Sequence, residues 1–188
     1  ATKLFPNVGW GEDLPPAFRK SPIAYLDEIE FLGAKPILVG CVQMSPTDMD
    51  RMAAKGAKVV WCPRSNDYLK LGTAPIDKMR KHKIPVALGT EGLASTNTLS
   101  LWDEMRFARK VFPNLSGEEL LRMATVEGAR VLGLLDVVGT LAIGKKADYL
   151  VVNVEADASH VYEALLESGH DYRVNKVVVQ GRTLKNII

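Results

Sequence analysis

The chain has 188 residues, of which 47% are hydrophobic and 24% charged, so it can bury a sizeable core and is not a disordered tail. Its formal net charge is only +2, and its one dense basic cluster, at residues 80–83, is a solvated helix end, which excludes the basic surface that nucleic acid requires. No apolar stretch reaches the ~20 residues that cross a bilayer, so we expect no membrane partner and a cytoplasmic location.

The chain begins with an irregular part and then becomes regular. Residues 1–20 are rich in Pro and Gly without a sustained period, which predicts an irregular arm. A helix is predicted to follow, with Ser21 as its N-cap, Pro22 at its first position and Gly33 as its stop. The run 35–44 is continuously apolar without alternation, which predicts a strand covered on both faces.

The same unit of helix and strand then repeats. Ser45 begins a helix that ends at Gly56, and a strand is predicted over 57–63. A further helix over 74–84 precedes a strand over 85–90. Strands that alternate with helices through short connections are parallel and joined by right-handed crossovers, so the fold class is α/β, as an open sheet or as part of a barrel.

Two core-facing helices are predicted after this parallel part. One covers 97–112, with Ser95 and Asn97 as candidate caps before it. The other covers 116–134, where Ser116 and Glu119 have the spacing of a capping box.

The chain closes with a small β element. Strands are predicted over 147–154 and 175–186, and Gln180-Gly181 divides the second of these as a tight hairpin turn. The boundary falls within 134–144. We therefore divide the chain into two parts, residues 1–136 and residues 137–188.

Two cysteines are present, Cys41 and Cys62, each after an apolar run. They lack the spacing of a metal or redox pair, so reduced and buried thiols are expected.

Four ordered segments together resemble the amidohydrolase superfamily, in its branch of nucleoside and guanine-type deaminases and triazine chlorohydrolases. The resemblance covers nearly everything from Ser21 onward, and its segments are 59–79, 86–109, 116–134 and 138–153. It implies the C-terminal half of a (β/α)8 TIM-type barrel, starting after the fourth strand and so holding four strands, in 1–136. It implies terminal strands of a small β-sandwich in 137–188.

The resemblance also implies a chemistry at the C-terminal ends of the strands. The family is a metal-dependent hydrolase family that binds a divalent metal, zinc or iron, through a His-x-His pair, a further His and an Asp. The metal acidifies a bound water, and the hydroxide attacks an sp² carbon that bears an amine or a halide. The implied substrate is a small heteroaromatic or nucleobase-like ring.

This sequence departs from the family pattern at the residues that carry this chemistry. Gly40 stands where a strand normally ends in a His ligand, and it has no side chain to bind a metal. Trp61 stands where many relatives have a substrate-facing His, and Glu91 replaces the Asp that serves as metal ligand and base. The additional methylene of Glu moves the carboxylate by about 1.5 Å, and a displacement of this size can cost ~100-fold in rate.

Each candidate site residue has two interpretations. Glu91 is the catalytic residue and metal ligand, or a strand-end carboxylate that caps backbone N–H groups or is solvated. Trp61 stacks on a heteroaromatic substrate, or is a core aromatic. Arg64 binds an anionic or carbonyl group of the substrate, or donates to backbone oxygens as a structural residue. Ser65 and its neighbours are turn formers that shape the loop after the strand.

The histidines offer no replacement ligand. His82, His160 and His170 are the only three, and none lies at a position that matches the family's ligands, so we expect surface or packing roles.

Half of a barrel would expose strand edges and apolar side chains. We therefore expect an oligomer, formed with a separate N-terminal half or with a second copy of the chain. Two functions remain open: a hydrolase of heteroaromatic C–N or C–halide bonds, or a catalytically degenerate relative that binds a ligand or partner.

Overall fold

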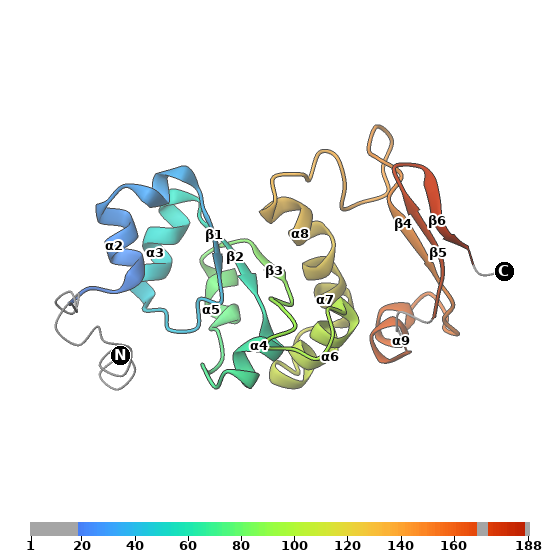
Figure 1. The fold of residues 1–188 in the computed structure, drawn as a ribbon, viewed down its shortest axis with the longest axis horizontal. Helices are drawn as coiled ribbons and strands as arrows, with labels where there is room; N and C mark the ends of the chain where they lie inside the picture. The colour runs from blue at the N-terminus through green and yellow to red at the C-terminus, as the bar shows by residue number, and fades with distance from the viewer. Residues whose placement is uncertain (1–18, 169–172, 187–188) are drawn as a thin grey trace.

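Three parallel strands form the sheet on which the candidate site is built (Figure 1). The computed structural model describes residues 19–168 and 173–186. The strands β1 (Ile37–Val39), β2 (Lys58–Trp61) and β3 (Val86–Leu88) are neighbours in chain order. This confirms the parallel α/β fold, although the described residues hold three barrel strands rather than four. Of the irregular arm predicted for residues 1–20, residues 1–18 lie outside the described residues.

The helices before β1 and β2 begin where their local sequence predicts. The Ser21 hydroxyl accepts a hydrogen bond from the Ala24 N–H at 3.0 Å and caps α2 (Pro22–Glu28). Ser45 and Asp48 form a capping box at the start of α3 (Pro46–Lys55), which ends at Gly56.

The end of the first helix was predicted wrongly. Helix α2 ends at Glu28 rather than at Gly33, because Glu30 has a left-handed φ of 61° that no α-helix accommodates. A short 3-10 turn, η1 (Phe31–Ala34), completes the connection to β1.

The remaining helices follow the parallel strands. Helix α4 (Pro63–Tyr68) occupies the segment predicted as a loop after β2, and α5 (Ile76–Lys81) leads to β3. Helix α6 (Leu101–Val111) starts at Leu101, so its N-cap is Ser100, and the predicted caps Ser95 and Asn97 are wrong.

The predicted helix 116–134 is two helices. The Ser116–Glu119 capping box starts α7 (Gly117–Ala124), and α8 (Val126–Val131) follows after a break. The break lies at Thr125, whose φ of −127° and ψ of −81° depart from helical values.

Strand β1 is not covered on both faces, as its apolar run predicted. Ile37 is 41% exposed and Val39 is 55% exposed, and β1 is an edge strand of the three-stranded sheet. An apolar run without alternation predicts burial on both faces, but the described residues cover this face of β1 only in part.

A second, antiparallel sheet contains β4 (Tyr149–Val152), β5 (Val174–Val179) and β6 (Arg182–Asn186). The Gln180-Gly181 turn was predicted correctly, and both residues have the positive φ of a two-residue hairpin turn. Helix α9 (Val161–Ser168), which was not predicted, packs against α6 and α7. Helices α6, α7 and α8 lie between the two sheets in Figure 1.

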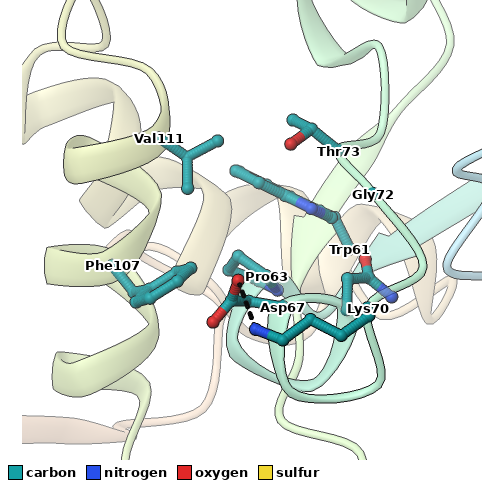
Figure 2. A pocket seen from close by; sticks show the side chains of 9 residues that line it. Trp61, Pro63, Asp67, Lys70, Gly72, Thr73, Phe107 and Val111 are labelled. Atoms are coloured by element: carbon teal, nitrogen blue, oxygen red, sulfur yellow. Dashed lines mark hydrogen bonds and ion pairs between the residues drawn. The ribbon is translucent and has the colours of Figure 1, made fainter.

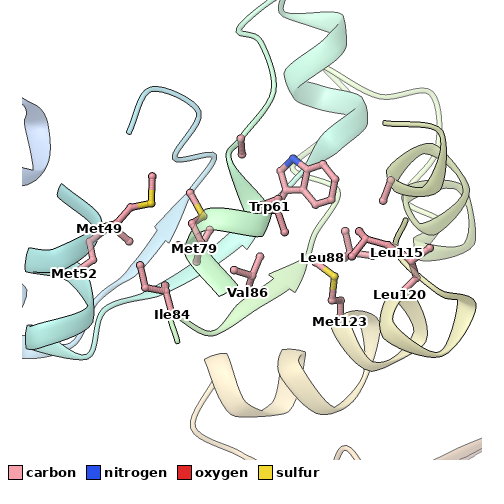
Figure 3. Close-up of a cluster of buried hydrophobic side chains, with 14 of the residues drawn as sticks. Met49, Met52, Trp61, Met79, Ile84, Val86, Leu88, Leu115, Leu120 and Met123 are labelled. Atoms are coloured by element: carbon pink, nitrogen blue, oxygen red, sulfur yellow. The ribbon is translucent and has the colours of Figure 1, made fainter. Parts of the chain in front are cut away.

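The core lies between the parallel sheet and its helices (Figure 3). Val59 and Trp61 of β2 share one face of the sheet with their β3 partners Val86 and Leu88. Methionines of α3, α5, α6 and α7 and leucines 115 and 120 pack against this face. Within the described part of the chain, no helix is long and apolar enough to cross a membrane.

Candidate functional site

The C-terminal ends of the three parallel strands meet at one edge of the sheet. Gly40 directly follows β1, Trp61 ends β2, and Glu91 lies three residues past the end of β3. Backbone bonds continue the sheet here, from Gly40 N–H to the Val60 carbonyl at 3.0 Å and from Gly89 N–H to the Trp61 carbonyl at 2.9 Å. Parallel register therefore brings positions 40, 61 and 91 to a common rim, as expected for the active end of a barrel.

The Glu91 carboxylate has one anchored oxygen. Its Oε2 accepts a hydrogen bond from the Ser65 hydroxyl of α4 at 2.5 Å and lies 3.4 Å from the Ser95 hydroxyl. Glu91 is exposed, whereas both serines are buried. Within the described chain no hydrogen bond reaches Oε1, and the Glu91 residue is exposed to solvent.

The Glu91 backbone is also held from the end of β2. Its φ of 55° lies in the left-handed region, which is uncommon for a residue with a side chain. A backbone hydrogen bond joins Glu91 to the thiol of Cys62. The pKa of the Cys62 thiol is raised to about 11, mainly by burial, so the thiol is neutral at neutral pH. The hydrogen bond from the Glu91 backbone opposes this shift, and the carboxylates of Glu91 and Glu104 add to it.

The Cys62 thiol is buried as expected, but the other thiol is not. Cys41 is only half-buried because it lies past the edge strand β1, and both cysteines are free.

Arg64 holds the segment between β3 and α6. Its guanidinium donates to the Thr98 hydroxyl at 3.0 Å and to the Asn97 amide oxygen, and it lies 3.7 Å from the carboxylates of Asp103 and Glu104. These partners are side chains rather than the backbone oxygens of the structural interpretation. The contacts fix the segment that carries Glu91 and Ser95 against α4.

Glu104 of α6 is a fully buried carboxylate beside this network. Its Oε2 accepts the Arg64 backbone N–H at 3.2 Å, and its Oε1 has no hydrogen-bond partner. Burial raises the pKa of Glu104, and the nearby charges of Asp103 and Glu91 raise it further, while Arg64 opposes the shift.

Trp61 is buried, at 1% exposure, and its ring meets Phe112 in an edge-on contact with centroids 5.5 Å apart. It also lines a cavity of about 260 Å³ between β2, α4 and α6. Figure 2 shows Phe107 and Val111 of α6 on one side of this cavity and the Trp61 ring between them and Thr73. The structure thus brings Trp61 and Glu91 to one rim but places their side chains in different surroundings.

The described histidines lie away from Glu91. His82 ends α5, with Nδ1 2.7 Å from the Lys78 carbonyl and Nε2 3.4 Å from Asp50. His160 is exposed and contacts Asp157 at 2.9 Å. The third, His170, lies outside the described residues.

The residues around Glu91 do not fit the implied metal on their own. Its near neighbours are the hydroxyls of Ser65 and Ser95, which are not usual ligands of zinc or iron, and the single thiol of Cys62. Gly40 supplies no side chain, and residues 19–168 and 173–186 hold no group of three His, Cys, Asp or Glu side chains placed to bind a metal. A zinc or iron ion would need ligands from outside the described residues.

Sequence reasoning missed most of the groups that surround Glu91. Ser65 was read as a turn former and Ser95 as a helix cap, yet both hydroxyls face the Glu91 carboxylate. Their separation in sequence from Glu91 differs, at 26 and 4 residues, so no local period marks them. One signal was available in the sequence. Ser65 follows the end of β2, Glu91 follows the end of β3, and these two strands are neighbours in the parallel sheet.

A parallel sheet with helical crossovers and polar residues at its C-terminal rim is the arrangement of part of an α/β barrel. The chain belongs to the amidohydrolase family, whose model matches residues 17–184.

The curated relatives include a 5-methylthioadenosine/S-adenosylhomocysteine deaminase of Desulfitobacterium hafniense. It is 37% identical over 179 residues, which are 89% of this chain and 41% of the relative. The chain therefore spans less than half the length of this relative.

Solved structures agree with this family. An adenosine deaminase from Xanthomonas campestris with bound zinc superposes with a TM-score of 0.81 at 31% identity, covering 88% of this chain and 40% of that one. A mutant atrazine chlorohydrolase from Arthrobacter aurescens, complexed with zinc and atraton, gives a TM-score of 0.79 at 27% identity, over 95% of this chain and 41% of that one. The fold is thus part of a TIM-barrel amidohydrolase, and relatives in this family hold zinc.

Proposed function

We propose that this chain forms part of a hydrolase that removes an amine, or a halide, from a heteroaromatic ring. The observation that carries the proposal is the Glu91 carboxylate, which is exposed at the C-terminal rim with one oxygen anchored and the other without a hydrogen bond from the described residues. Deaminases and a chlorohydrolase among the relatives and neighbours support the reaction class.

In this proposal Glu91 moves the proton. Water attacks the ring carbon that bears the exocyclic amine, and Glu91 Oε1 takes a proton from the water as the C–O bond forms. The protonated carboxyl then returns the proton to the amine nitrogen, the C–N bond breaks, and ammonia leaves. General acid–base catalysis of this kind contributes about 10²–10⁴-fold in rate.

Trp61 and Arg64 are the proposed substrate-binding residues. Trp61 supplies an aromatic wall to the cavity beside α6, and a cavity of about 260 Å³ exceeds the ~150 Å³ that holds a benzene ring. Arg64 lines a second hollow together with Asn97 and Phe107, where its charge would face a carbonyl or anionic substituent.

The rest of the barrel is proposed to come from an N-terminal half or from a second copy of the chain. Exposed apolar side chains on the edge strand β1 support such a partner. A zinc or iron ion would enter with ligands from that segment. The division at 136/137 and a cytoplasmic location remain predictions.

A second candidate function is ligand or partner binding without hydrolysis. It is favoured by Gly40, which offers no ligand at the rim, and by the described residues, which hold no group of three side chains placed to bind a metal.

The experiment is an assay of the protein purified from its source, so that any companion segment or copy stays with it. Ammonia release is measured with adenosine, guanine and cytosine analogues, halide release with a chlorotriazine, and bound zinc and iron are quantified in the same sample.

Release of ammonia or halide with stoichiometric metal supports the hydrolase. Absence of metal and of both products, with saturable binding of one of these rings, supports the binding function instead.

A further inference from the structure

We propose that Ser65 is a positioning residue, supported by Ser95, that fixes one oxygen of the Glu91 carboxylate so that the other faces the reacting atoms. The inference deepens the proposed function, in which Glu91 moves the proton.

The side chains of Ser65, Ser95 and Glu91 lie within hydrogen-bond distance of one another. A hydroxyl has one proton to donate, and Ser65 is 2.5 Å from Glu91 Oε2 and 2.9 Å from the Ser95 hydroxyl. Because the carboxylate only accepts, Ser65 donates its proton to Glu91. The Ser95 hydroxyl lies beside this pair, 2.9 Å from the Ser65 oxygen, 3.4 Å from Glu91 Oε2 and 3.3 Å from the Gly92 carbonyl. Hydrogen bonds to a charged acceptor are about twice as strong as neutral ones, so the bond from Ser65 holds Oε2 in place.

The two serine hydroxyls and the Glu91 carboxylate differ in their exposure to water. Ser65 is fully buried and Ser95 is 7% exposed, whereas Glu91 is exposed. Water therefore competes poorly for the hydroxyls but reaches the carboxylate. A buried hydroxyl that lost its partner would carry a desolvation cost, which opposes rotation of Ser65 away from Glu91.

The Ser65 hydroxyl has no competing role in its own helix. Helix α4 has Cys62 as its N-cap and no side-chain capping bond, so Ser65 does not cap it. Cys62, the residue just before α4, accepts a hydrogen bond from the Glu91 backbone at its thiol. Cys62, which precedes α4, and Ser65, which lies within it, therefore contact the backbone and the carboxylate of Glu91 separately.

The left-handed backbone of Glu91 is consistent with a constrained position. Its φ of 55° is unfavourable for a residue with a side chain, and such a conformation persists where surrounding contacts determine it. Ser95 N–H also closes the following turn on the Gly92 carbonyl at 3.0 Å, which keeps Ser95 behind the carboxylate.

The first test needs no activity. Thermal unfolding is measured for the wild type, Ser65→Ala, Glu91→Ala and the double variant. If the hydroxyl and the carboxylate act together, the double variant loses less in Tm than the two single losses combined. Ser100→Ala with Glu91→Ala is the matched control and is expected to be additive. Additive losses for Ser65 and Glu91 would overturn the inference.

The second test uses the protein purified from its source, together with any N-terminal half or second copy that stays bound to it. The substrate is the one that the assay described under the proposed function identifies. Ser65→Ala is expected to lower kcat tenfold or more with KM within twofold, because the base is misaligned while the substrate still binds. Ser65→Thr, which keeps the hydroxyl, is expected to recover most of kcat. An unchanged kcat in Ser65→Ala, or an equal change in KM, would contradict the positioning role.

The two claims fail separately. If the wild type releases no product, the proposed function is lost, and the unfolding cycle alone decides whether Ser65 fixes Glu91. If product is released and the cycle is additive, the function stands and the positioning role does not.

Discussion

Single serine hydroxyls determine several local features of this molecule. Ser21, Ser45 and Ser116 each accept a backbone N–H at the start of a helix. These caps were predictable because each depends on residues within three or four positions. Nothing in the local sequence distinguishes Ser65 and Ser95 from these capping serines. Their hydroxyls contact Glu91 instead, because the tertiary fold brings the three residues together.

Asp48 joins two of these caps. It is 2% exposed, and its carboxylate accepts hydrogen bonds from the Ser21 hydroxyl at 2.5 Å and from the Ser45 N–H at 3.1 Å. Burial acts to raise the pKa of Asp48, but the bonds from Ser21 and Ser45 outweigh it, so the pKa lies below its ordinary value.

Replacement of Asp48 by Asn is expected to destabilise the protein by about 1–3 kcal/mol at pH 7, the range for hydrogen bonds to a charged group. A lowered folded-state pKa contributes stability above the unfolded value of about 3.9, and this stability is lost as pH falls through the folded value. Urea unfolding at pH 7 and pH 3 checks this. The difference in free energy of unfolding between the wild type and Asp48→Asn should be smaller at pH 3 than at pH 7. An equal difference at both pH values would contradict this prediction.

Among the elements, the strands and crossover helices were predictable and the connections between them were not. Apolar runs and Pro, Ser and Gly signals located β1, β2, β3 and the helices α3 and α5. Helix α4 was missed because Pro, Ser and Asn favour turns in isolation. The break at Thr125 was missed because the apolar period continues through it, and its geometry depends on how α7 and α8 each pack against β3.

Gly89 allows β3 to end close against β2. A Cβ at this position would lie 2.5 Å from Val60 Cγ1 and 3.2 Å from Cys62 Sγ. Gly89→Ala is therefore expected to destabilise the protein by about 1–3 kcal/mol through overpacking. Gly92→Ala is the matched control, since nothing lies within 4 Å of its added Cβ. Chemical denaturation of both variants tests this, and equal midpoints would refute the packing argument.

For the whole molecule, the family pattern predicted the fold more completely than the site. Register alone brings Gly40, Trp61 and Glu91 to one rim, so their common edge followed from the order of strands. The surroundings of each side chain did not follow, because they depend on which face of the sheet a residue occupies and on what packs there. Trp61 faces the helices, while Glu91 meets the hydroxyls of α4 and the loop before α6.

The open face of β1 predicts association of the chain. Val39 is 55% exposed on an edge strand, which offers unpaired backbone groups and apolar surface to another polypeptide. Val39→Lys should shift the sedimentation of the isolated chain toward the monomer. Leu141→Lys is the control, since Leu141 is 74% exposed outside any strand. Identical sedimentation of Val39→Lys and wild type would show that this edge is not used.

The central claim is that the Glu91 carboxylate moves the proton in hydrolysis, and kcat/KM of Glu91→Gln tests it most directly. In the protein purified with its companions, the expected fall is about 10²–10⁴-fold, because glutamine keeps the shape but does not exchange a proton. Glu155→Gln, an exposed glutamate after β4, should match the wild type. A kcat/KM for Glu91→Gln within threefold of the wild type would contradict the account.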